Sequence, residues 1–74
     1  MLHERFMVNM RRIREDRGLT QRQLGERMDV SAPYIAELEA GRHTPSLKIA
    51  ERVAEALGIT TETLLGKIPE KIAG

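Results

Sequence analysis

The chain has 74 residues, the size of one small domain, and 41% of them are hydrophobic. The absence of cysteine excludes a disulfide scaffold and suits a reducing compartment. No apolar run approaches the roughly 20 residues that a membrane span requires, and residues 1–5 lack the apolar core of a secretion signal. We therefore expect a cytoplasmic globular domain that makes no contact with a membrane.

The net charge of +1 conceals an uneven distribution along the chain. Residues 1–27 contain seven arginines and four acidic residues, which gives +3, whereas residues 28–74 sum to −2. A basic half is compatible with contacts to nucleic-acid phosphates, but the asymmetry alone describes a solvated surface equally well.

The first predicted helix is indicated by Leu2, Phe6, Met10 and Ile13, which recur at helical spacing and share one face. Gly18 ends this helix as a left-handed cap. The composition also favours helices over strands, because only two aromatic residues stand among many Ala, Leu, Ile and Arg.

The second and third predicted helices are separated by a very short turn. Thr20 opens the second helix, over about 21–28, and forms a capping box with Gln23 three residues later. Ser31 caps the third helix, which ends near Ala40.

Two further helices follow a loop over residues 42–45. Ser46 caps the fourth helix, which Gly58 ends, and Thr60 caps a short fifth helix. The sequence therefore predicts an all-α fold of five short helices, with one domain over residues 1–66 and a C-terminal tail over 67–74.

The span 21–40 carries the functional signal. Gly25 is small where the second helix of a helix-turn-helix, here the third predicted helix, must approach the first helix of that motif closely. Ile35 and Leu38 are expected to face the core, so the other side of the third helix faces outward, with Ala32, Pro33, Ala36, Glu37 and Ala40.

At these residues the chain resembles the phage-repressor and Cro-type helix-turn-helix family. The resemblance covers roughly residues 6–66 and rests on Gly18-Leu19-Thr20-Gln21, Leu24-Gly25, Val30-Ser31, Tyr34-Ile35, Leu38-Glu39-Ala40-Gly41, Pro45-Ser46-Leu47 and Ala56-Leu57-Gly58-Ile59. It implies a compact five-helix, repressor-like domain that binds operator DNA as a homodimer.

The family's DNA-binding roles fall on two helices and a loop of this chain. By the resemblance, Gln21 grips a phosphate from the start of the second helix. The loop after the recognition helix touches the DNA backbone through Arg42, His43 and Thr44. The groove-facing positions of the recognition helix are Ser31, Ala32, Pro33, Ala36 and Glu37.

The resemblance also implies two structural roles. Arg14 and Glu39 match an internal salt bridge beneath the DNA-binding surface. The region of Leu64, Leu65 and Ile68 matches the dimer contact, and we expect Leu64 to face inward and the other two to face the partner.

This chain departs from the family at the start of the recognition helix. Family members often have glutamine there, which reads adenine, whereas this chain has Ala32-Pro33 and can offer only apolar contact, for example with thymine methyl groups. Glu37 could accept a hydrogen bond from cytosine N4, although it also brings negative charge close to the phosphates. We therefore expect modest affinity per subunit and strong dependence on DNA shape and on dimerisation.

Two further residues are DNA-binding candidates from their type and place. Arg22 lies beside Gln21 and is the best placed of the exposed arginines. Two roles of Tyr34 are equally compatible with the sequence: packing at the edge of the core, and contacting a phosphate or base. Its ring can pack while its hydroxyl reaches outward.

The sequence favours a regulator over an enzyme. His3 and His43 are the only histidines, no ligand spacing for a metal is present, and no glycine-rich phosphate loop occurs, so we expect neither catalysis nor a cofactor. The main hypothesis is a sequence-specific DNA-binding transcriptional regulator that blocks or recruits polymerase. The alternative is an antitoxin-type module that binds a toxin through residues 59–74 and autoregulates its operon.

Overall fold

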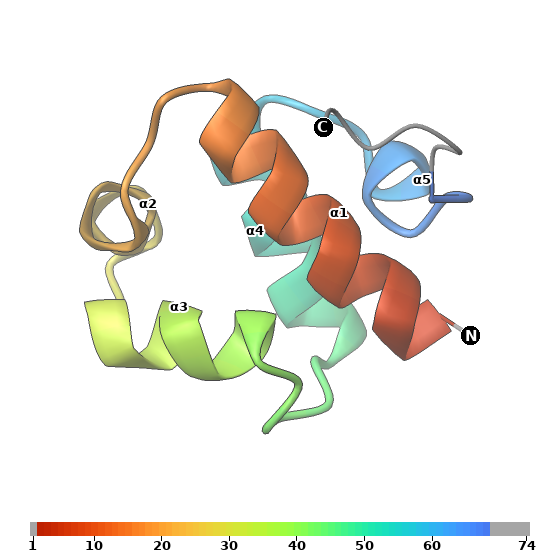
Figure 1. Ribbon diagram of the computed structural model, residues 1–74, viewed down its shortest axis with the longest axis horizontal. Coiled ribbons are helices and arrows are strands. Elements are labelled where there is room, and N and C mark those ends of the chain that lie inside the picture. Colours follow the sequence, from red (N-terminus) through yellow and green to blue (C-terminus); the bar gives the residue numbers. More distant parts are fainter. Residues whose placement is uncertain (1, 69–74) are drawn as a thin grey trace.

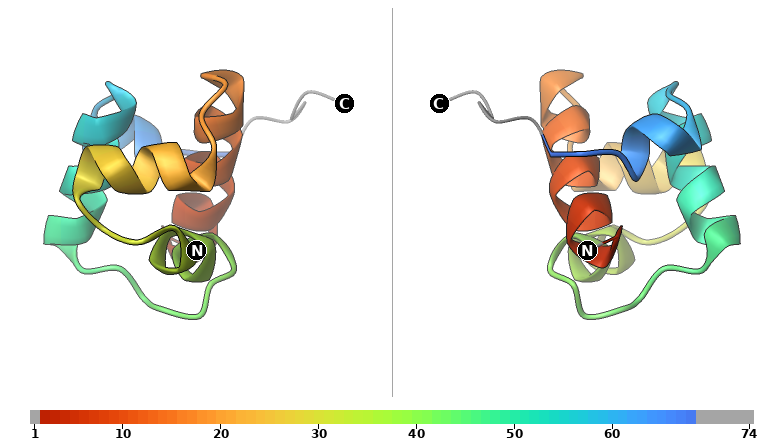
Figure 2. Two further views of the ribbon diagram at one scale, coloured as in Figure 1. Left: turned by 90° about the vertical axis from the view of Figure 1, so that its left-hand side faces the viewer. Right: turned by 90° about the vertical axis from the view of Figure 1, so that its right-hand side faces the viewer.

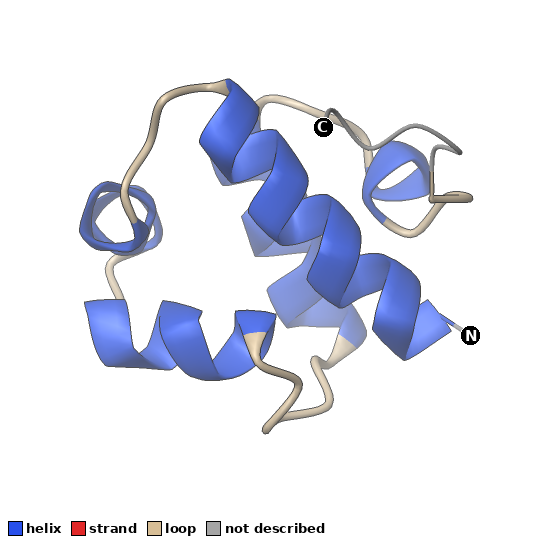
Figure 3. Ribbon diagram, viewed as in Figure 1, coloured by secondary structure: helices blue, strands red, loops and turns tan. Residues whose placement is uncertain are grey.

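The computed structural model describes residues 2–68, and the end of the predicted tail, residues 69–74, lies outside this range. The described residues form five helices, and no strand occurs among them (Figure 3). The all-α prediction is confirmed. The helices are α1 (Leu2–Asp16), α2 (Gln21–Met28), α3 (Ala32–Glu39), α4 (Leu47–Leu57) and α5 (Thr61–Leu64).

The helix starts lie where the capping residues predicted them. Thr20 and Gln23 form the predicted capping box, in which the Thr20 hydroxyl accepts from the Gln23 amide and the Gln23 side chain accepts from the Thr20 amide. The other three caps also accept a hydrogen bond from the backbone amide three residues on; they are Ser31, Ser46 and Thr60. Each cap satisfies an amide that has no partner inside its helix.

The helices enclose one core between α1 and α4. In Figure 1, α1 crosses in front of α4, with α2 and α3 on one side of the pair and α5 on the other. The core side chains come from all five helices: Phe6, Met10, Ile13, Leu24, Met28, Ile35, Leu38, Ala50, Val53, Ala54, Leu57 and Leu64. The predicted inner face of the first helix is confirmed at Phe6, Met10 and Ile13.

A buried polar residue within this core was not predicted. Asn9 is only 1% exposed, and its Nδ2 donates to the carbonyl oxygens of Leu64 at 3.0 Å and Gly66 at 2.9 Å. Arg12 Nη2 donates to the Asn9 Oδ1 atom at 3.3 Å. Asn9 therefore joins α1 to the C-terminal end of α5, whose carbonyls would otherwise lack partners.

None of the helices in the described range is both long enough and apolar enough to cross a membrane.

Candidate nucleic-acid interface

The helix-turn-helix is formed by α2, the turn at Asp29–Val30 and α3. Figure 1 shows α2 end-on and α3 lying in the plane, so the two helices cross at a steep angle. Asp29 adopts a left-handed conformation with φ of 57°, which ends α2. The Val30 amide then donates to the Gly25 carbonyl at 2.8 Å.

Position 25 requires glycine because the backbone after the turn approaches it closely, and not because a side chain of α3 does. A Cβ atom at this position would lie 2.7 Å from the Val30 carbonyl oxygen and 3.4 Å from the Ser31 carbonyl oxygen. The sequence predicted a close approach at Gly25, and the structure identifies the approaching group as the backbone just before α3.

The two faces of α3 divide as the sequence predicted. Ile35 and Leu38 are fully buried, whereas Ser31, Pro33 and Ala40 are exposed. Along the same outer side the partly buried residues are Ala32, Ala36 and Glu37. Figure 2 shows α3 and the loop that follows it along one edge of the molecule.

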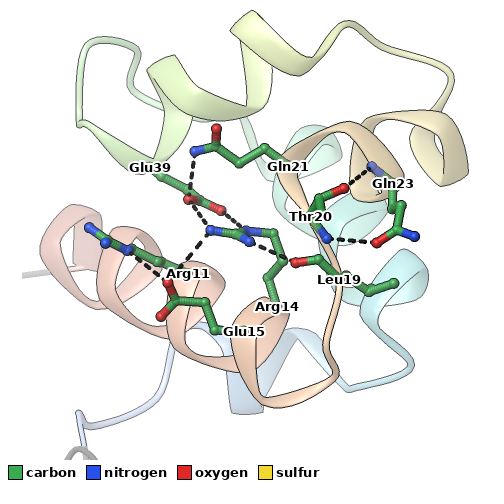
Figure 4. A network of polar contacts seen from close by, with 8 residues as sticks. All are labelled: Arg11, Arg14, Glu15, Leu19, Thr20, Gln21, Gln23 and Glu39. Atoms are coloured by element: carbon green, nitrogen blue, oxygen red, sulfur yellow. Dashed lines mark hydrogen bonds and ion pairs between the residues drawn. The ribbon is translucent and has the colours of Figure 1, made fainter.

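The expected pairing of Arg14 with Glu39 is present as a two-pronged ion pair behind α3. Arg14 Nε donates to Glu39 Oε2 at 2.7 Å and Nη2 donates to Oε1 at 3.0 Å. The two side chains are 9% and 4% exposed. Arg14 Nη1 also donates to the Leu19 carbonyl at 2.7 Å, so one guanidinium joins α1, the loop before α2, and α3 (Figure 4).

The hydrogen bonds and charge of Glu39 raise the pKa of Arg14 above its ordinary value, although burial acts in the opposite direction. A group whose pKa is raised on folding stabilises the fold below its unfolded pKa and loses that contribution only as the pH rises through the folded value. Arg14 is therefore charged throughout the neutral range, and its own titration adds no pH dependence there.

Gln21 belongs to the same network. Its Nε2 donates to Glu39 Oε1 at 3.1 Å, which fixes the amide at the N-terminus of α2 (Figure 4). An amide nitrogen carries two hydrogens, so one remains for a second acceptor. A shallow hollow of about 280 Å³ opens here; it is lined by Arg11, Arg14, Gln21, Ala36, Glu39 and Ala40.

The loop after α3 returns to the outer face of that helix. His43 Nε2 lies 3.2 Å from Glu37 Oε1, and the His43 and Tyr34 ring centroids are 5.9 Å apart. Arg42 and Thr44 are exposed on either side of His43. The sequence named each of these residues separately, but no spacing rule indicated that they form one cluster.

Two arginines that the sequence did not single out hold α2 against α4. Arg27 Nη1 donates to the Ala56 carbonyl at 3.2 Å, and Arg52 Nη2 donates to the Met28 carbonyl. Arg22, in contrast, is exposed and has only a loose pair with Glu26 at 3.8 Å.

The residues expected at the dimer contact lie at the end of α5 and in the segment after it. Leu64 is fully buried, as predicted, whereas Leu65 and Ile68 are partly buried. Leu65 also lines a largely apolar hollow of about 160 Å³ beside Pro45 and Leu47. Leu47 is 67% exposed and is the only large hydrophobic residue so exposed within residues 3–68.

No cluster of three or more histidine and acidic side chains able to hold a metal ion occurs in the described part of the chain.

Comparison with known proteins places the match on this same region. A family model described as helix-turn-helix matches residues 10–64. The immunity repressor protein of Bacillus phage phi105 is 46% identical over 55 residues, which are 74% of this chain and 38% of the phage protein. An uncharacterized HTH-type transcriptional regulator of Methanothermobacter thermautotrophicus is 49% identical over 49 residues, 66% of this chain and 71% of that protein.

Solved structures with the same arrangement of helices are also found. The clp gene regulator ClgR from C. glutamicum superimposes with a TM-score of 0.81 at 37% identity, over 88% of this chain and 84% of the ClgR chain. A hypothetical transcription factor, NHTF, from Neisseria gives 0.84 at 28% identity, over 96% and 79%. This chain thus spans well under half the length of the phage repressor, but most of both solved chains.

Proposed function

Because this chain belongs to the Cro/repressor-type helix-turn-helix family, a non-enzymatic family of DNA-binding transcriptional regulators, we propose that it binds a pseudo-palindromic operator as a homodimer. The observation that carries the proposal is the outer side of α3, which is exposed at Ser31, Pro33 and Ala40 while its inner side is fully buried. A helix supported from behind in this way can enter the major groove without moving.

The residues that flank α3 support contacts to the DNA backbone. The free hydrogen of the Gln21 amide and the N-terminus of α2 offer donors to one phosphate. Arg11 and Arg22 are exposed nearby, and Arg42 is exposed in the loop that follows α3. Phosphate contacts from these positions fix the register of the recognition helix in the groove.

The apolar hollow beside Leu65 supports the proposed dimer contact. Thr44 and Pro45, in the loop after α3, form part of its lining, so a second copy seated there would lie beside the DNA-facing side. Leu47 and Leu65 line this hollow and would lose exposed apolar surface in that contact. A twofold axis in this place can set two α3 helices about 34 Å apart, the distance between successive major grooves.

The decisive experiment is the selection of bound sites from random duplex DNA. We expect an inverted repeat whose half-sites lie about 10 base pairs apart, and a mass of two chains at micromolar concentration. Selected sites without inverted symmetry, or a monomer bound to one half-site, would contradict the homodimer. Tight capture of one protein in preference to any duplex would favour the antitoxin hypothesis.

A pair of matched variants tests the DNA-facing side. Ala36 and Ala56 are both partly buried alanines on helix surfaces, but Ala36 lies on the outer side of α3 and Ala56 lies on α4. We expect Ala36→Asp to abolish sequence-specific binding, since it adds negative charge facing the phosphates. Ala56→Asp controls for any loss of stability, and equal effects of the two variants would count against α3.

A further inference from the structure

The negative charge of Glu37 is unfavourable on a helix that binds DNA. Glu37 is on the outer side of α3, where its charge would be repelled by phosphates on both sides of the groove. A flexible carboxylate also pays rotamer entropy before it can read a base. An acidic residue can contribute to specificity here only if something holds it and offsets its charge.

His43 can do both in part: its ring N–H holds the carboxylate by a hydrogen bond, and the dipole of that N–H offsets some of the carboxylate charge. Its Nε2 lies 3.2 Å from Glu37 Oε1, and the two side chains are 50% and 46% exposed. A carboxylate can only accept a hydrogen bond, so Nε2 must carry the hydrogen, as it does in both the neutral Nε2–H tautomer and the imidazolium. The contact engages Oε1, and Oε2 can accept from a second donor.

The ring of Tyr34 supports the ring of His43. Its ring centroid is 5.9 Å from that of His43 with 33° between the planes, and Tyr34 itself packs against the core. The imidazole is thus braced by a side chain anchored in the fold, one helical turn from Glu37 on α3. The loop over 42–44 thereby acts on the reading face of the helix before it.

We propose that His43 is a positioning residue for Glu37, holding its carboxylate to accept from one base amino group of the operator half-site. This inference rests on the proposed function. The amino group chemistry fits cytosine N4, the donor that acidic side chains accept from in the major groove. His43 therefore acts on sequence preference through Glu37, and not only on overall affinity.

Two substitutions of His43 separate its hydrogen-bond donor from its ring. His43→Phe keeps an aromatic ring beside Tyr34 but removes the donor, whereas His43→Gln removes the ring and keeps an amide donor near the position of Nε2. Glu37→Gln marks the base pair that Glu37 reads. Arg42→Gln, at the neighbouring exposed position, is the matched control, because we expect Arg42 to touch only phosphate.

The readout is the base preference at each half-site position. It is measured as the dissociation constant for each other base divided by that for the preferred base. We expect His43→Phe to lower this ratio by about 2- to 10-fold, the effect of one ordinary hydrogen bond, at the position where Glu37→Gln lowers it. His43→Gln should retain most of the base preference. In the Glu37→Gln background, His43→Phe should cause no further loss of base preference. Arg42→Gln should weaken all sites by one common factor.

A nitrogen-detected NMR spectrum of the free protein tests the contact without DNA. We expect Nε2 of His43 to carry the hydrogen and its signal to shift in Glu37→Gln, while the signal of His3 does not. The inference is overturned if His43→Phe weakens all sites equally, if His43→Gln behaves like His43→Phe, or if no position responds to Glu37→Gln. A wild-type protein with no base preference would instead refute the proposed function.

Discussion

At the scale of single residues, Arg14 joins three segments of the chain through one buried side chain. It makes two hydrogen bonds to Glu39 and one to the Leu19 carbonyl, in a place where both charges are nearly excluded from water. A buried pair of this kind need not add net stability over apolar residues. Removing one partner is different, because the remaining charge stays buried without compensation.

We therefore expect Arg14→Ala to lower the free energy of unfolding by about 3–5 kcal/mol, measured by urea denaturation. Arg11→Ala is the control, because its pair with Glu15 has the same charges but is 64% and 54% exposed. An exposed pair contributes at most about 1 kcal/mol. Unfolding of Arg14→Ala at the wild-type urea concentration would contradict a structural role for the pair.

Asn9 allows a sharper test, because aspartate has the same shape and no amide donor. Asn9→Asp would place a carboxylate against the Leu64 and Gly66 carbonyl oxygens that now accept from Nδ2. We expect a loss of about 1–3 kcal/mol or more, together with faster hydrogen exchange at the Leu64 and Leu65 amides of α5. Glu62→Gln, an isosteric change at an exposed position of α5, should change neither quantity.

At the scale of elements, the helix boundaries were predictable because local chemistry determines them. The side chains that cap α2, α3, α4 and α5 act within three residues of themselves. Gly18 and Gly58 have positive φ, which other residues rarely adopt. The buried faces followed from helical periodicity for the same reason.

The contacts between elements were only partly predictable. Asn9 lies three residues after Phe6 and four before Ile13, so its place on the apolar face was visible in the sequence. Its acceptors were not, because they lie 55 and 57 residues away in the chain. The cluster of Tyr34, Glu37 and His43 likewise depends on the path of the loop, which no capping signal specifies.

The turn between α2 and α3 offers a test at this scale. Gly25→Ala would gain up to about 1 kcal/mol in helix propensity, but the added methyl group would lie 2.7 Å from the Val30 carbonyl oxygen. Backbone cannot rotate away as a side chain can, so we expect a net loss of about 1–3 kcal/mol. Circular dichroism melting against Glu26→Ala, an exposed neighbour, would measure it, and a stabilised Gly25→Ala would show that the turn tolerates the methyl group.

At the scale of the whole molecule, the arginines of the basic N-terminal half differ in how firmly acidic partners hold them. Most of its arginines are paired: Arg11 with Glu15, Arg12 with Asp16, Arg14 with Glu39 and Arg22 with Glu26. The exposed pairs of Arg11 and Arg22 are weak enough to be exchanged for a phosphate. The pair of Arg14 is not, because it is buried and forms part of the fold.

This division predicts how operator affinity responds to salt. Each phosphate neutralised by a protein cation contributes about −0.9 to the slope of log K against log salt concentration. If Arg11, Arg22 and Arg42 each neutralise one phosphate per subunit, a dimer should give a slope of about −5. Arg42→Gln and Arg22→Gln should each make the slope shallower by about 2, because two copies of the cation are lost.

Arg27→Gln is the control for that measurement, since Arg27 faces α4 and donates to the Ala56 carbonyl. Its slope should equal that of the wild type even if the variant is less stable. A slope near zero would mean that the exposed arginines stay with their acidic partners, and binding would then depend on groove contacts alone. If the slope became shallower by the same amount in Arg22→Gln, Arg42→Gln and Arg27→Gln, general electrostatic attraction would explain binding better than defined phosphate contacts.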